Sequence, residues 1–161
     1  MAVHSLEHAR GLAMSDSLAA TLNELASEII GLGIDTVSVQ RIEKMIVQYG
    51  DRFIDRVFTE TEKSYCGAYK ESSERFAGRW AAKEAVVKAL GVGLAQGVCW
   101  KEIEIDARSH GAPKVRLTGM AEQVCMQLDV SQVLVSISHC SGRCIANAFA
   151  VKNTKDPVED S

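Results

Sequence analysis

Apolar residues surround nearly the whole circumference of one predicted helix, the segment 72–91 (SSERFAGRWAAKEAVVKALG). The segment contains no proline, begins with serines where N-caps belong, and ends at Gly91, where glycine commonly follows a helix. A surface helix would confine its apolar side chains to one stripe. The pattern therefore predicts a central helix that is largely buried.

The remaining apolar positions predict short strands and short helices. Period-two alternation and β-branched residues indicate strands, whereas apolar positions three or four residues apart indicate helices. We expect strands at 29–37, 103–105, 115–117, 133–138 and 144–151, with a hairpin turn at 139–142. We expect helices at 17–30, 39–49, 59–69 and 121–128, the third of them opened by a capping box from Thr59 to Glu62. This order of elements predicts an α+β fold.

The length of 161 residues suits one domain with a single core. We expect the domain to span residues 29–152. Residues 1–28 form an N-terminal extension that we expect to be partly disordered, with a short helix from residue 17. The polar tail, residues 153–161, is expected to be disordered.

Composition narrows the classes of function. The net charge of −3 argues against a general nucleic-acid binder. No apolar run approaches the roughly 20 residues of a membrane-spanning helix. The five cysteines are an odd number without a C-x-x-C pair, so we expect reduced thiols, most of them in the core, in a cytoplasmic protein.

Four charged residues lie on the otherwise apolar central helix: Arg79, Lys83, Glu84 and Lys88. A buried ion is costly without a partner, so each must pair, coordinate a metal or line a cleft. Glu84 and Lys88 are four residues apart, which also fits an ordinary ion pair on a half-exposed helix. The helix alone does not decide between that pair and a carboxylate that holds a metal beside phosphate-binding cations.

Two further polar residues interrupt apolar surroundings. Asp35 stands in the strand IIGLGIDTV, whose glycines let another backbone approach closely. It fits either a turn or N-cap residue before the next helix or a functional carboxylate. His139 stands at the predicted hairpin turn. Two carboxylates from different elements suit Mg²⁺, and nearby cations suit a pyrophosphate, which together indicate phosphoryl-group chemistry.

The sequence resembles the holo-[acyl-carrier-protein] synthases of the 4′-phosphopantetheinyl transferase superfamily over roughly residues 29–152. The stretches that carry the resemblance occur in the family's order: GLGIDTVSVQRI, FIDRVFTETE, FAGRWAAKEAVVKALGVG, the stretch 100–105, GAPKVRLTG and SISH. The first stretch and the R-W-A-A-K-E-A-x-x-K-A helix are specific in combination. Trp80 replaces a smaller aromatic residue, and the first 28 residues lie outside the family pattern.

The resemblance implies transfer of 4′-phosphopantetheine from coenzyme A to a serine of apo acyl carrier protein, for fatty acid biosynthesis, with release of adenosine 3′,5′-bisphosphate. It implies that Asp35 and Glu84 bind Mg²⁺ and that Lys88 meets the pyrophosphate, the three acting as catalytic residues. It further implies contacts from Arg79, Lys83, Lys88 and His139 to coenzyme A phosphates, and docking of the acidic carrier by Arg41 and Arg52. The serine needs a base, either Glu84 or a metal-bound water.

The family fold implied is a small antiparallel sheet packed on a long central helix. Family members are usually homotrimers whose sites are completed at a subunit interface. A second reading, from another class, is a non-catalytic module that binds coenzyme A or a carrier protein, although such a binder has no need for both carboxylates. A third is a Mg²⁺-dependent phosphohydrolase that uses no acceptor. The preferred carrier and the role of residues 1–28 are not encoded in these motifs.

Overall fold

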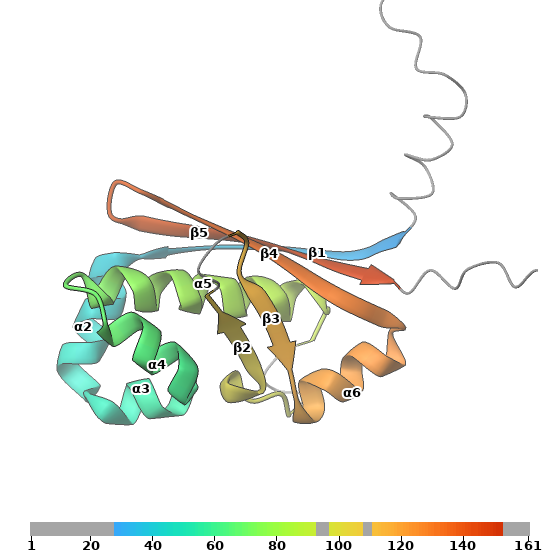
Figure 1. The fold of residues 1–161 in the computed structure, drawn as a ribbon, viewed down its shortest axis with the longest axis horizontal. Helices are drawn as coiled ribbons and strands as arrows, with labels where there is room; N and C mark the ends of the chain where they lie inside the picture. Colours follow the sequence, from blue (N-terminus) through green and yellow to red (C-terminus); the bar gives the residue numbers. More distant parts are fainter. Residues whose placement is uncertain (1–27, 93–96, 108–110, 153–161) are drawn as a thin grey trace, which may run out of the picture.

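The computed structural model describes residues 28–92, 97–107 and 111–152 (Figure 1). One long helix lies against a five-stranded antiparallel sheet with strand order β1-β5-β4-β3-β2. Three short helices gather at one end of the long helix, and a fourth lies near the other end (Figure 1). The elements are β1 (Ile29–Ser38), α2 (Val39–Tyr49), α3 (Asp51–Val57), α4 (Glu60–Gly67), α5 (Ser72–Ala89), η2 (Trp100–Glu102), β2 (Ile103–Asp106), β3 (Lys114–Leu117), α6 (Gly119–Gln127), β4 (Val130–Cys140) and β5 (Arg143–Lys152).

The long helix α5 is the buried central helix that the sequence predicts. Its alanines and valines form much of the hydrophobic core beneath β1, β5 and β4. Gly91 follows its end with a φ of 64°, the left-handed conformation that glycine adopts most readily. The predicted serine N-cap is wrong. Glu71 occupies that position and makes no capping hydrogen bond through its side chain.

Strand β1 lies unusually close to α5 because two of its residues lack a side chain. A Cβ atom on Gly31 would overlap the carbonyl oxygen of Ala89, and one on Gly33 would overlap that of Ala85. The predicted close approach of a second backbone is therefore confirmed, and α5 is the partner. This contact fixes the height of β1 over the helix that carries Glu84 and Lys88.

The β4–β5 hairpin turns more tightly than expected. Only Ser141 and Gly142 form the turn, and both have positive φ values, 49° and 74°. This is the backbone of a two-residue turn whose twist matches the flanking strands. His139 consequently lies within β4, paired with Cys144, and not in the turn itself.

Of the other predicted elements, the strands and the helices after residue 30 are confirmed, with small changes at their ends. Helix α4 ends at Gly67 and not at Tyr69, and α3 was not predicted. Residues 17–27 of the predicted helix at 17–30 lie outside the described residues, and Ile29 and Ile30 belong to β1 instead. The predicted disorder at the two ends of the chain concerns residues that are not described. No helix in the described part of the chain is both long and apolar enough to cross a bilayer.

All five cysteines are free thiols. Cys66, Cys125 and Cys144 are buried, as expected for most of them, whereas Cys99 and Cys140 are exposed. Burial raises the pKa of the Cys66 thiol to about 12 and that of Cys144 to about 11. These two thiols therefore stay protonated and act as small core residues.

A fully buried ion pair joins α4 to α5. The Lys83 Nζ atom lies 2.8 Å from Glu62 Oε2, and neither side chain is exposed. Lys83 also donates to the carbonyl oxygens of Val57 and Trp100, each at 2.8 Å. Glu62 accepts from the backbone N–H of Thr59 at 2.9 Å, which completes the predicted capping box, and from that of Ile105 at 3.0 Å.

Breaking this pair from either side should destabilise the fold strongly. Glu62→Gln leaves a buried ammonium without its anion, and Lys83→Met leaves a buried carboxylate without its cation. Each change should lower the free energy of unfolding by about 3–5 kcal/mol. The double variant should lose much less than the sum of the two, because it buries no charge and keeps one acceptor oxygen, for either Thr59 or Ile105. Urea denaturation measures all three.

Lys63→Met is a matched control, because it breaks an exposed ion pair with Asp55 on the same side of the molecule. It should change the unfolding midpoint little. Losses from the two single substitutions that simply add in the double variant would show that the residues are not coupled.

Candidate active site

Asp35 and Lys88 meet between β1 and α5. Lys88 Nζ lies 2.8 Å from Asp35 Oδ1 and donates to the carbonyl oxygen of Ile34 at 3.0 Å. The Asp35 side chain is 17% exposed and that of Lys88 is 49% exposed, so the pair lies at the edge of the interior. Asp35 pairs with Ala146 in the sheet, and Ser38 is the N-cap of α2. The alternative reading of Asp35 as a helix cap is therefore wrong.

Glu84 lies one helical turn before Lys88 and faces the same region. Burial raises the pKa of the Glu84 carboxyl, and the negative charge of Asp35 raises it further. The positive charges of Lys88 and Arg41 act in the opposite direction. In the described residues Lys88 has an ion pair with Asp35 and none with Glu84, so the alternative of a simple Glu84–Lys88 pair is not what forms.

The two carboxylates fit the donor set of a magnesium ion. Mg²⁺ prefers oxygen ligands and is commonly held by one or two carboxylates, with water and substrate phosphates as its other ligands. Asp35 and Glu84 supply two carboxylates from different elements, and the negative charge of Asp35 raises the pKa of Glu84. Within the described ranges no cluster of three or more His, Cys, Asp or Glu side chains is present. A cage made only of protein ligands is therefore not the kind of site formed there.

Lys83 lies elsewhere. Its ammonium is enclosed by Glu62 and two carbonyl oxygens, and its side chain is fully buried. Burial lowers the pKa of Lys83, and the adjacent Glu62 opposes that shift. The prediction that Lys83 contacts a coenzyme A phosphate does not fit this position, because a phosphate would have to enter the core and displace Glu62. We correct its role to a structural one.

Arg79 is also mostly enclosed, with 5% of its surface exposed. Its guanidinium carbon lies 4.4 Å from the centre of the Tyr65 ring, a cation–π contact. Its Nε atom is buried and has no hydrogen-bond partner among the described residues. Arg79 and Glu84 are five residues apart, so they point about 140° apart around α5.

His139 lies against α5 from the sheet side. A Cβ atom on Gly78 would come within 3.2 Å of His139 Nε2, so the glycine makes room for the imidazole. His139 is exposed. It therefore lies next to the helical turn that carries Arg79, and the described contacts do not join it to Asp35.

The two predicted docking arginines are exposed on neighbouring helices, Arg41 on α2 and Arg52 on α3. The sequence did not reveal that Arg41 also lies near Glu84. It is close enough to Glu84 to lower the pKa of that carboxyl. Arg41 is therefore exposed on α2 and also lies near the Glu84 carboxylate.

Sequence reasoning missed the partners of the buried cations. Tyr65 and Tyr69 stack with centroids 5.1 Å apart, and Arg75 lies over Tyr69 as Arg79 lies over Tyr65. The sequence contains a pattern that could have indicated these contacts, because the two tyrosines are four residues apart and so are the two arginines. Glu62 was assigned only a capping role, although an ion in an apolar helix requires an opposite charge somewhere in the fold.

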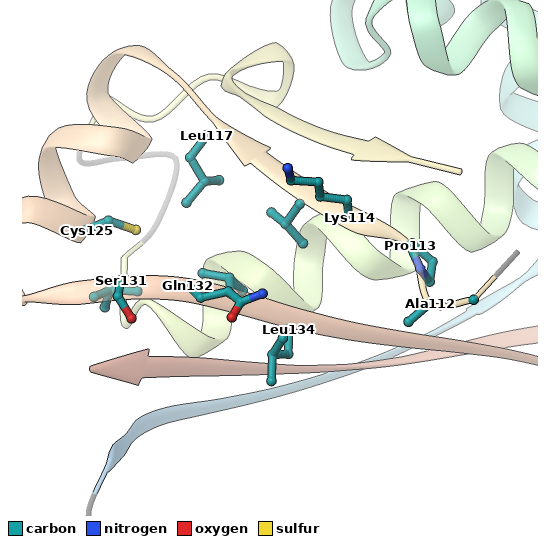
Figure 2. Close-up of a pocket in the computed structure, with 12 residues that line it drawn as sticks. Ala112, Pro113, Lys114, Leu117, Cys125, Ser131, Gln132 and Leu134 are labelled. Carbon is teal, nitrogen blue, oxygen red and sulfur yellow. The ribbon is translucent and has the colours of Figure 1, made fainter. Parts of the chain in front are cut away.

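A cleft of about 720 Å³ opens between β3 and β4 (Figure 2). These strands pair only through Lys114 and Leu134 and then diverge. Leu117 and Cys125 lie on the side of the cleft opposite Ser131 and Gln132 (Figure 2). None of the predicted site residues lines this cleft. The charged cluster of Asp35, Glu84 and Lys88 therefore lies outside this cleft.

Comparison with known proteins places these residues in a family. The family model described as the 4′-phosphopantetheinyl transferase superfamily matches residues 31–148. The chain is 43% identical over 124 residues to the holo-[acyl-carrier-protein] synthase of Chlamydia pneumoniae, which covers 77% of this chain and 98% of that protein. Residues before about 30 lie outside the family match.

Solved structures give the same result. The holo-[acyl-carrier-protein] synthase of Neisseria meningitidis superposes with a TM-score of 0.71 at 29% identity, covering 77% of this chain and 99% of that one. The Helicobacter pylori synthase, solved in complex with coenzyme A, superposes with a TM-score of 0.65 at 31% identity, covering 74% and 98%. By sequence and by fold, the chain belongs to the 4′-phosphopantetheinyl transferase superfamily and groups with its holo-[acyl-carrier-protein] synthases.

Proposed function

We propose that this protein transfers the 4′-phosphopantetheine group from coenzyme A to a serine of apo acyl carrier protein and releases adenosine 3′,5′-bisphosphate. The observation that carries the proposal is the Asp35–Glu84–Lys88 cluster at the junction of β1 and α5. It combines two carboxylates with a half-exposed lysine in a chain of this family. A module that only binds coenzyme A has no chemical need for two facing carboxylates.

Asp35 and Glu84 would hold Mg²⁺ through their oxygen atoms, and the ion would neutralise charge on the pyrophosphate as its bridging bond breaks. Lys88 supplies a second positive charge at the same place. Its long side chain ends at the surface, where the leaving phosphate can be reached. The chain's contribution to the transfer is mainly the placement of these charges before the substrate arrives.

The acceptor serine must lose a proton as it attacks. Glu84 is the group suited to accept it, directly or through a water molecule, because its raised pKa makes it a stronger base than an exposed glutamate. The positive charges of Lys88 and Arg41 oppose the effects of burial and Asp35 on the pKa of that carboxyl. The same arginine is exposed to an approaching acidic carrier, with Arg52 on the next helix.

Coenzyme A phosphates would be met by Arg79 and His139. The buried Nε–H of Arg79 has no acceptor among the described residues, and His139 is exposed beside the same turn of α5. These two residues and the Glu84 carboxylate lie on different sides of α5 within one protomer. We therefore propose that one substrate molecule bridges two protomers of a homotrimer, with each protomer contributing a different side of its helix.

The outer face of the sheet offers a surface for this assembly. Leu32, Phe149 and Leu134 are register neighbours across β1, β5 and β4, and they form one exposed apolar row. Their exposed fractions are 63%, 37% and 47%. An apolar row of this kind on a sheet face is typical of a surface buried by a partner, and closed symmetric assemblies are the common outcome.

The transfer itself is tested with coenzyme A, Mg²⁺ and an apo acyl carrier protein, by intact mass of the carrier. The carrier should gain the mass of one phosphopantetheine group. Asp35→Asn and Glu84→Gln should each slow transfer by at least about 100-fold, since each removes a preorganised charge. Release of phosphopantetheine with an unmodified carrier would instead indicate a hydrolase, and binding without turnover would indicate a binding module.

Glu84→Gln also has an effect on stability that separates catalysis from folding. The pKa of Glu84 is raised in the folded state, so its ionised form costs stability as the pH rises through that pKa. A neutral glutamine removes this cost. The variant should therefore unfold at a higher temperature than the parent near neutral pH in the presence of EDTA. A lower midpoint would mean that the Glu84 charge stabilises the fold.

Arg41→Glu should weaken the productive encounter with the carrier. Charges at the rim of an interface chiefly affect association and its salt dependence. We expect the KM for the carrier to rise by one to two orders of magnitude, equivalent to roughly 1.4–2.8 kcal/mol. The KM for coenzyme A should stay near that of the parent. Steady-state kinetics at two salt concentrations measure both.

Lys152→Glu makes the same charge change at the end of β5, where Lys152 is 50% exposed. It should leave both KM values near those of the parent. Equal losses for both substrates in Arg41→Glu would place Arg41 in the coenzyme site or in the fold, and not in docking.

Phe149→Asp should dissociate the assembly. A charge at the centre of the apolar row would be buried without a partner in a trimer but exposed in a monomer. Light scattering should change from the mass of a trimer to that of a monomer, with loss of transfer. Met126→Asp, at a 70% exposed position on α6, is the control and should leave the mass unchanged. An active monomeric parent would contradict shared sites.

A further inference from the structure

The ammonium of Lys88 is bound to the Asp35 carboxylate, the group that a divalent cation would bind. Its nitrogen lies 2.8 Å from Asp35 Oδ1, and it is held there by a second hydrogen bond to the Ile34 carbonyl oxygen at 3.0 Å. An ammonium is a compact positive charge that can take the place of a metal ion beside a carboxylate. In this structure, therefore, the charge of Asp35 is already satisfied by the protein.

The carboxylate pair requires such a charge when no metal is bound. Glu84 is partly buried and faces the negative charge of Asp35, and both effects raise its pKa. Lys88 and Arg41 are the positive groups that oppose them. Of these two, Lys88 makes the direct ion pair with Asp35. The lysine thus balances the repulsion that would otherwise open the site.

The Asp35–Lys88 ion pair can be broken readily because it is accessible to water. Half of the Lys88 side chain is exposed, in contrast to Lys83, whose side chain is completely enclosed by its three oxygen partners and the core. Exposed ion pairs are weak because water replaces them readily, whereas buried ones cannot be broken without leaving a bare charge. A divalent cation at Asp35 can therefore displace Lys88 without disturbing the fold.

We propose that Lys88 is an internal counter-ion that covers Asp35 until a divalent cation displaces it, and that this displacement frees the ammonium for the phosphates of coenzyme A. The proposal rests on the proposed function, since it concerns the same site. It makes cation binding and phosphate binding cooperative, because the first frees the lysine that the second uses. By linkage the coupling is reciprocal, so a bound pyrophosphate that holds Lys88 also favours the cation.

The competition predicts the effect of removing the lysine on cation affinity in the absence of any substrate. Mn²⁺ binding is followed by electron paramagnetic resonance of the free ion, with the full chain and no coenzyme A. Lys88→Met should bind Mn²⁺ about tenfold more tightly than the parent. Lys63→Met removes the same charge from another ion-paired lysine and should stay within about twofold of the parent. An unchanged or weaker affinity in Lys88→Met overturns the proposal.

A second pair of variants separates displacement from general repulsion between positive charges. In an Asp35→Asn background the lysine has no carboxylate to cover, so adding Lys88→Met should change Mn²⁺ affinity by less than about twofold. A tenfold gain that persists in this background would show that Lys88 acts only as a distant charge, and the proposal would fail. Circular dichroism of each variant confirms that the affinities refer to folded protein.

NMR of the unsubstituted chain tests the displacement of Lys88 from Asp35 even where a variant fails to fold. The two ε-methylene protons of Lys88 should have distinct NMR shifts while the ammonium is fixed on Asp35 and Ile34, and the shifts should merge when Mg²⁺ is added. Shifts that stay distinct at saturating Mg²⁺ overturn the displacement. If the parent binds neither ion, the proposed metal site and this inference fail together. If it binds and transfers but Lys88 is unaffected, only this inference fails.

Discussion

The buried ion pair between Glu62 and Lys83 is the interaction that organises the fold around α5. Neither charge could remain in the core alone, so the two must meet, and their remaining hydrogen-bonding capacity must be satisfied. Thr59, Ile105, Val57 and Trp100 meet that requirement from four different segments. The pair therefore fixes the rotation of α5 relative to α4 and β2. The residue after Lys83 is Glu84, so the same contact determines where the Glu84 carboxylate points.

Much of the fold could be predicted because it follows from local rules. The all-round apolar pattern of α5, the capping box at Thr59 and the glycines of β1 each have one physical explanation, and each was confirmed. The exceptions are places where local rules were weak. Helix α3 has only seven residues, too few for its periodicity to be recognised, and the start of α5 lacks the side-chain cap that its serines indicated.

The site was harder to predict because sequence spacing does not reveal the partner of a charge. Lys83 and Lys88 are the same residue type on the same helix, and both were expected near phosphates. The positions differ by about 140° around the helix axis, so one faces α4 and the other faces β1. Only tertiary structure shows that Glu62 lies beside the first and Asp35 beside the second. The structure brings Asp35, Glu84 and Lys88 together, as the family resemblance implied, but it encloses Lys83 in the core.

The Glu62–Lys83 and Asp35–Lys88 ion pairs both involve α5 and obey the same electrostatics, but they have opposite roles. Enclosure makes the Glu62–Lys83 pair permanent, because separating it would strand a charge in the core. Solvent access makes the Asp35–Lys88 pair exchangeable, because water can solvate either partner and another cation can replace the lysine. A rigid pair beside an exchangeable one gives α5 a fixed frame for the proposed site, whose charges would rearrange on binding of substrate and metal. The difference between structure and function on this helix is therefore a difference in exposure, which the identity of the residues does not encode.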